Sequence, residues 1–93
     1  MSIRALPKKA GLLEDWHPAD IVAELRKAGW SLRKLAIHHG YKAPSTLKNA
    51  IAAPWPKGER LIAEAIGVKP QDIWPSRFAE RARRKAEAQR EAA

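Results

Sequence analysis

The sequence of 93 residues contains no cysteine. Disulfides and thiolate-based zinc sites are therefore excluded, and the composition suits an intracellular protein. No run approaches the roughly 18 consecutive apolar residues of a membrane span, and residues 1–13 lack the long apolar segment of a signal peptide. We therefore expect a soluble, cytoplasmic protein that does not enter a membrane.

Signatures of catalysis are also missing. The sequence has no glycine-rich phosphate loop, no paired carboxylates in a plausible pocket and no metal-ligating cluster. His38 and His39 are adjacent, so on a helix they point about 100° apart and do not chelate one metal as an i, i+4 pair does. We predict packed or surface histidines there, and a protein that is not an enzyme and uses no cofactor, metal or small-molecule substrate.

Acidic residues are absent from the long interval between Glu24 and Glu59. That interval holds the following basic residues: Arg26, Lys27, Arg33, Lys34, Lys42, Lys48 and Lys57. A solvated helix face normally interleaves both signs, so this interval is the electropositive part of a chain with a net charge of +8. We expect a polyanionic partner, with nucleic acid as the first candidate and an anionic membrane surface as the second.

A short amphipathic segment opens after Trp30, within the acid-free interval. Ser31 is a good N-cap, and Gly40 ends the segment because glycine reaches the left-handed conformation without a side-chain clash. The residues spaced for one buried helical face are Leu32, Leu35, Ala36 and His39. The pattern predicts a helix that stops in a tight turn.

A second segment follows the turn and begins with Pro44, whose fixed φ suits the first position of a helix. Its apolar face comprises Leu47, Ala50 and Ile51, and its outward face comprises Ser45, Lys48, Asn49 and Ala52. Two such helices, with small and amide-bearing residues outward on the second, are typical of a DNA-binding helix-turn-helix. Position 46 is Thr where the common register has an aliphatic residue, so we expect a turn one residue longer than usual.

The chemistry of the second segment identifies candidate contacts. Asn pairs bidentately with adenine, Ser and Thr hydrogen-bond to several base edges, and Lys reaches guanine or a phosphate. The candidates for base contacts are Ser45, Thr46, Lys48 and Asn49. The candidates for backbone contacts are Ser31, Arg33, Lys34, Tyr41, Lys42 and Lys57. For Asn49 the alternative is a helix cap or a solvent contact, and for each backbone candidate it is an idle surface residue.

Further helices are predicted on both sides of this pair, within one domain spanning residues 14–78. One runs from Pro18 to Gly29, another from Lys57 or Gly58 to Ile66, and a short turn lies between Pro70 and Pro75. Tryptophans stand beside helix ends and prolines, which favours core and staple roles over stacking on single-stranded bases: Trp16, Trp30, Trp55 and Trp74.

The two ends of the chain are expected to be less ordered than the domain. Residues 1–13 are predicted to be a flexible basic arm, either an unstructured leader or a segment that lies along phosphates. Phe78 is the last expected core residue, and residues 79–93 form a charged tail that is disordered or a frayed helix. Its surface pairs at i, i+4 spacing are Glu80 with Arg84 and Arg83 with Glu87.

Four blocks carry a family resemblance: Asp15–Ile21, Ser45–Ala50, Trp55–Glu59 and Ile73–Arg77. They closely resemble, in the same order, blocks of the Ner family of phage Mu-type DNA-binding transcriptional regulators. The resemblance covers residues 14–78 and implies an all-α, five-helix domain similar to the lambda repressor and Cro DNA-binding domains. It also implies a sequence-specific regulator that binds double-stranded DNA, a repressor of phage or prophage early transcription.

A DNA-binding regulator is thus the leading hypothesis, and a non-specific architectural or protein-interaction module is the alternative. Flat affinity across unrelated duplexes would favour the alternative. Dimerisation stays open, because symmetric operators usually need two copies whereas no heptad or broad apolar strip marks an interface. If a homodimer forms, we expect it on DNA.

Overall fold

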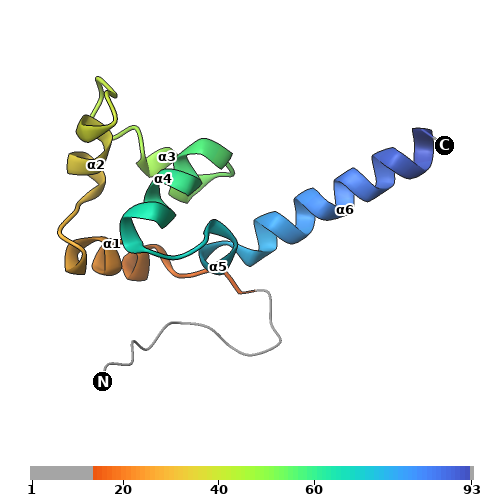
Figure 1. The fold of residues 1–93 in the computed structure, drawn as a ribbon, viewed down its shortest axis with the longest axis horizontal. Helices are drawn as coiled ribbons and strands as arrows, with labels where there is room; N and C mark the ends of the chain where they lie inside the picture. Colours follow the sequence, from red (N-terminus) through yellow and green to blue (C-terminus); the bar gives the residue numbers. More distant parts are fainter. Residues whose placement is uncertain (1–13, 93) are drawn as a thin grey trace.

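The computed structural model describes residues 14–92, and this range is helical without a strand. The helices are α1 (Pro18–Lys27), α2 (Leu32–His38), α3 (Lys48–Ala52), α4 (Pro56–Ile66), α5 (Pro70–Ile73) and α6 (Pro75–Ala92). Figure 1 shows the first five gathered into one body from which α6 projects. The predicted all-α class is confirmed, but the count of five helices is not, since six helices are present between residues 14 and 92. The arm predicted at residues 1–13 lies outside the described residues.

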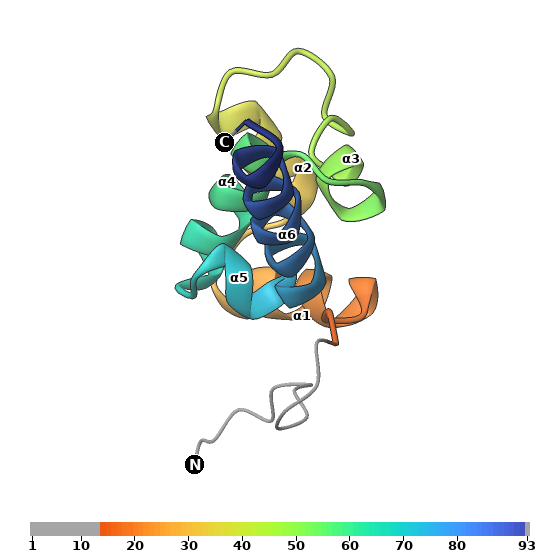
Figure 2. The same ribbon diagram turned by 90° about the vertical axis from the view of Figure 1, so that its right-hand side faces the viewer.

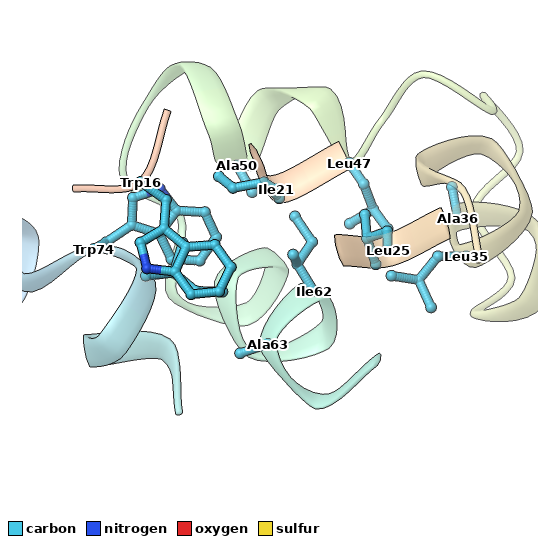
Figure 3. Close-up of a cluster of buried hydrophobic side chains, with 11 residues drawn as sticks. Trp16, Ile21, Leu25, Leu35, Ala36, Leu47, Ala50, Ile62, Ala63 and Trp74 are labelled. Atoms are coloured by element: carbon cyan, nitrogen blue, oxygen red, sulfur yellow. The ribbon is translucent and has the colours of Figure 1, made fainter. Parts of the chain in front are cut away.

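Helix α4 is the centre of the body and packs against α1, α2, α3 and α5. Ile62 and Ala63 of α4 are fully buried, and they lie in one cluster with aliphatic side chains of α1, α2 and α3 (Figure 3). The remaining core residues are Trp16, Ile21, Leu25, Leu35, Ala36, Leu47, Ala50, Ile73 and Trp74. The apolar stripes predicted from 3- and 4-residue spacing therefore meet in a single core. Trp16 belongs to this core at 3 % exposure, and its backbone N–H donates to the carbonyl of Ile73 (2.9 Å).

Glycines end the helices where the sequence predicts. Gly40 follows α2 with φ +84°, and Gly67 follows α4 with φ +96°, a conformation that side chains with a Cβ rarely adopt. The prediction that His39 belongs to the buried face of α2 is wrong. His39 is exposed and lies one residue past the last helical position. The buried face of α2 therefore consists of Leu35 and Ala36, with Leu32 half-buried.

Helix α3 begins later than predicted from Pro44. Residues 44–47 instead form successive turns, in which the N–H of Thr46 donates to Ala43 and the N–H of Lys48 donates to Ser45, both at 3.1 Å. These bonds span three residues, as in a 3₁₀-helix, and the α-helical part starts at Lys48. The connection between α2 and α3 thus covers residues 39–47 and is longer than the tight turn predicted.

The sequence predicts that residues 79–93 form a charged tail that is disordered or a frayed helix, and residues 79–92 are helical as part of α6. Its first turns are anchored to the body, since the Ser76 N–H donates to Asp15 (2.9 Å) and Arg81 contacts Glu59. The predicted surface pairs are present, each with a hydrogen bond of 3.0 Å: Glu80 with Arg84 and Arg83 with Glu87. Beyond Arg81 the side chains through Arg90 are exposed, and Figure 1 shows this end of α6 directed away from the body, while Figure 2 looks along α6 towards the body.

None of the helices between residues 14 and 92 combines the length and the apolar character needed to cross a membrane.

Candidate nucleic-acid interface

Helix α3 presents two distinct faces. Leu47 and Ala50 are fully buried beneath it. The predicted outward residues Ser45, Lys48, Asn49 and Ala52 are all exposed. Thr46 differs from them, because it is half-buried and its hydroxyl donates to the carbonyl of Ala43 (2.8 Å). Three of the four base-contact candidates are thus available to a partner, while the hydroxyl of Thr46 already stabilises the turn before α3.

The start of α2 holds three of the backbone-contact candidates. The hydroxyl of Ser31 accepts a hydrogen bond from the N–H of Lys34 (3.0 Å), so Ser31 is the N-cap that the sequence predicts. The ammonium of Lys34 donates to the carbonyl of Gly29 (3.3 Å), which holds it at this helix end. Arg33 is exposed. Lys34 is also exposed, so both cations lie at the surface, and Lys34 is the one held to the backbone by this hydrogen bond.

The other backbone candidates lie in the connection before α3 and at the start of α4. Lys42 and Lys57 are exposed. Tyr41 is half-buried, with its ring packed edge-on against Trp55 at 5.9 Å between centroids. Tyr41 therefore has a packing role, and it joins the α2–α3 connection to the segment that leads into α4.

Trp55 also packs against the first turn of α4. A Cβ built on Gly58 would lie 2.3 Å from Cε3 of the indole, so glycine at this position allows the ring to approach the helix. The backbone N–H of Trp55 donates to the carboxylate of Glu59 (2.8 Å). These contacts fix the connection between α3 and α4, and with it the start of α4 where Lys57 lies.

The two acidic residues that border the acid-free interval add little negative charge to this surface. Glu24 is half-buried and forms an ion pair with Lys27 (3.2 Å). Glu59 is fully buried and contacts two arginines, Arg77 (3.1 Å) and Arg81 (2.7 Å). The exposed basic side chains of the interval are Arg26, Arg33, Lys42, Lys48 and Lys57, together with Lys27 and Lys34. The surface around α2 and α3 is therefore electropositive.

The cluster of Glu59, Arg77 and Arg81 was missed by the sequence reasoning. Burial of the Glu59 carboxylate would raise its pKa, but hydrogen bonds from Arg81, the Trp55 N–H and Arg77 outweigh burial and lower the pKa below its ordinary value. Arg77 and Arg81 are one helical turn apart on α6, and this i, i+4 spacing is the only trace of the cluster in the sequence. Their acidic partner is on another helix, so local periodicity does not reveal it.

The histidines take part in ring packing. His38 lies edge-on to Trp30 at 5.1 Å between centroids, and His39 lies edge-on to His38 at 4.9 Å. Among residues 14–92 no group of three His, Cys, Asp or Glu side chains is placed to hold a metal ion.

Comparison with known proteins places this geometry in a family. Residues 15–91 match the model of a family described as winged helix-turn-helix DNA-binding. The described residues supply the helix-turn-helix through α2 and α3, and they contain no strand.

Individual relatives are similar over most of the chain. The chain is 54 % identical to the Mu-like prophage FluMu DNA-binding protein Ner of Haemophilus influenzae, over 90 % of this chain and 92 % of that protein. It is 55 % identical to the negative regulator of transcription of Escherichia phage D108, over 70 % of this chain and 88 % of that protein.

A solved structure agrees with these relatives. The solution structure of the Mu Ner protein superposes with a TM-score of 0.60 and 54 % identity, covering 68 % of this chain and 84 % of that one. The resemblance inferred from the four sequence blocks is confirmed. The chain belongs to the helix-turn-helix DNA-binding family that includes the Ner proteins of Mu-like phages.

Proposed function

We propose that this chain represses transcription, at a phage or prophage promoter, by binding double-stranded DNA in a sequence-specific manner. In this proposal the exposed face of α3 enters the major groove, where Ser45, Lys48 and Asn49 contact base edges. Thr46 contacts a base edge through its methyl group, or through its hydroxyl after the hydrogen bond to the Ala43 carbonyl breaks. The names of the relatives support repression as the outcome, since the phage D108 protein is a negative regulator of transcription.

The observation that carries the proposal is the placement of Lys48 and Asn49. Both are exposed on α3, whose opposite face, Leu47 and Ala50, is fully buried. A polar, exposed face on the second helix of a helix-turn-helix is what major-groove reading requires. The electropositive surface around α3 supplies the sequence-independent part of the affinity.

Backbone contacts are proposed from residues on both sides of α3. Arg33 and Lys42 are exposed before it and Lys57 after it, so they are assigned to phosphates. Three other candidates already have partners within the chain: Ser31, Lys34 and Tyr41. We propose that they contact phosphates through their backbone N–H groups, or through their side chains after these leave their present partners.

The oligomeric state is part of the proposal. Operators read by helix-turn-helix proteins are commonly two-fold symmetric, with half-sites about one helical turn apart. We propose that two copies pair on DNA, in the bacterial cytoplasm where the nucleoid lies. Footprints with two protected half-sites and a stoichiometry of two chains per duplex are the expected results, and a single protected half-site would oppose pairing.

The experiment that tests sequence reading selects bound duplexes from a random pool and then compares variants on the selected and a random duplex. Asn49→Ala should reduce the preference for the selected duplex by about 1–3 kcal/mol. Gln71→Ala, which removes an exposed amide from α5, is the matched control and should keep the preference. Lys57→Ala should weaken binding to both duplexes alike and reduce the salt slope by about 1.

The alternative function, a non-specific architectural module, predicts a different result. The wild-type chain would then enrich no sequence and bind all duplexes equally, and Asn49→Ala would have no effect on preference. Enrichment that survives Asn49→Ala would leave sequence reading intact but move it to other residues.

A further inference from the structure

Two backbone carbonyls at the end of α3 lack the donors that a continuing helix would supply. The partner of the Ala50 carbonyl would be the N–H of residue 54, but Pro54 has none. The partner of the Ile51 carbonyl would be the N–H of Trp55, which instead donates to Glu59 (2.8 Å). The end of α3 therefore needs donors from elsewhere in the fold.

Arg77 of α6 supplies both donors. One guanidinium nitrogen donates to the carbonyl of Ala50 (2.5 Å) and the other to the carbonyl of Ile51 (2.9 Å). The planar guanidinium with its fixed fork of N–H groups suits two adjacent acceptors, which a lysine ammonium does not reproduce. Charge-assisted bonds of this kind are shorter and stronger than neutral ones.

Arg77 is itself held in place. It donates to the carboxylate of Glu59 (3.1 Å), and its guanidinium stacks over the Trp74 ring at 4.8 Å. The Arg77 side chain is 11 % exposed and that of Glu59 is fully buried. Moving Arg77 away would leave a buried carboxylate with fewer partners, which is unfavourable. The end of α3 is thus tied through Arg77 to both α4 and α6.

We propose that Arg77 is a positioning residue for DNA recognition, acting through the carbonyls at the C-terminal end of α3. The inference rests on the proposed function, in which Lys48 and Asn49 read bases. Asn49 directly precedes Ala50, whose carbonyl Arg77 holds. Because α3 has only five α-helical residues, a shift of its last turn displaces Asn49 in the groove. Base contacts depend on such placement, since hydrogen bonds weaken steeply when distance or angle is lost.

The test uses the full chain and two matched substitutions on α6. Arg77→Met keeps the apolar stem but removes the donors to α3. Arg81→Met also removes hydrogen bonds to Glu59, at 2.9 and 2.7 Å, but Arg81 has no contact with the end of α3 among the described hydrogen bonds. Affinities are measured for a duplex selected by the wild-type chain and for a random duplex of equal length, at a temperature where the unfolding curves show each variant folded.

The informative quantity is the ratio of the two affinities. A variant that is merely less stable loses the same fraction of folded protein on both duplexes, so its ratio is unchanged. Arg77→Met should lower the ratio by about tenfold, comparable with the loss of one good base contact. Arg81→Met should keep the wild-type ratio. A folded Arg77→Met variant with the wild-type ratio would overturn the proposal.

Arg77→Lys covers the case in which Arg77→Met does not fold. Arg77→Lys keeps the positive charge but loses the forked pair of N–H donors, so the affinity ratio should fall. The last turn of α3 should also open more often, which speeds amide hydrogen exchange at Ile51 and Ala52 relative to Ile62 in the core. An Arg77→Lys variant with the wild-type ratio and wild-type exchange in α3 overturns the proposal. Failure of the proposed function looks different, because the wild-type chain would then show no preference between the two duplexes.

Discussion

The carboxylate of Asp15 binds Ser76, which lies 61 residues later in the sequence. It accepts one hydrogen bond from the backbone N–H of Ser76 (2.9 Å) and one from the hydroxyl (2.7 Å). Ser76 is the second residue of α6, and its N–H is one of the donors that a helix leaves without a partner in its first turn. The start of the described chain therefore caps the last helix.

Replacing Asp15 with Ala should destabilise the fold and fray the start of α6. Loss of a capping carboxylate costs about 0.5–2 kcal/mol. Ser76→Ala should cost less, because it removes the hydroxyl but keeps the backbone N–H bond to Asp15. Chemical unfolding measures both, and amide exchange at Ser76 should accelerate in Asp15→Ala alone. Equal effects of the two substitutions would contradict the capping role.

Two serines on the candidate interface should differ in their effect on stability. Ser31→Ala removes the acceptor for the Lys34 N–H at the start of α2 and should lower the free energy of unfolding by about 1 kcal/mol. Ser45→Ala removes an exposed hydroxyl and should change it by less than about 0.5 kcal/mol. Thermal unfolding without DNA measures both. Similar losses would show that the cap at Ser31 contributes little.

A methyl group added at Gly58 should collide with Trp55. The new Cβ would lie 2.3 Å from the indole, so the ring has to move, and overpacking of this kind costs about 1–3 kcal/mol. This opposes the gain of about 0.5–1 kcal/mol expected from replacing glycine inside a helix. Gly58→Ala should therefore destabilise the wild-type chain but stabilise a Trp55→Ala chain. Destabilisation of the same size in both chains would show that the indole is not the cause.

Much of the fold follows from local sequence signals. Proline at the first position of α1, glycine after α2 and α4, and the apolar spacing predicted these helices close to their observed bounds, although α4 begins at Pro56, slightly before the predicted Lys57 or Gly58. The outward face of α3 was also predicted, because burial of Leu47 and Ala50 fixes which residues face away. The start of α3 was not predicted correctly. The residue types that favour the first turn of an α-helix also favour turns whose hydrogen bonds span three residues, so the sequence does not distinguish the two.

The contacts that sequence analysis missed are polar contacts between helices. Arg77 lies just before the charged tail and Arg81 lies within it. The tail has almost no apolar stripe, and such a segment alone is marginal as a helix in water. Helix α6, which contains this tail, is held to the body by Glu59 and Asp15, and these lie 18 or more residues from their partners along the chain. Charge spacing along one helix does not identify partners at that separation. Knowledge of the fold is needed to see that α6 contacts the end of α3 through Arg77.

The buried Glu59 should make stability sensitive to acid. Its folded-state pKa is lowered, because hydrogen bonds from Arg81, Trp55 and Arg77 outweigh the opposing effect of burial. The pKa of an unfolded glutamate is about 4.3, so the stabilisation is complete above that pH and is lost as the pH falls from there through the lower folded-state pKa. The free energy of unfolding should therefore fall on acidification below about pH 5.

Salt separates this contribution from that of Glu80. The pKa of Glu80 is also lowered, by hydrogen bonds from Arg83 and Arg84, but Glu80 lies at the surface, where salt screens its ion pairs. The acid-dependent loss due to Glu59 should persist at high salt, because its carboxylate is buried. Glu80→Gln should keep the high-salt pH dependence of the wild-type chain. Glu59→Gln should remove much of that dependence, and it should also lower stability at neutral pH because two arginines lose their acidic partner.

Denaturant unfolding across the acid range measures both effects. If the stability of the wild-type chain at high salt were constant below about pH 5, Glu59 would not stabilise the fold as a carboxylate.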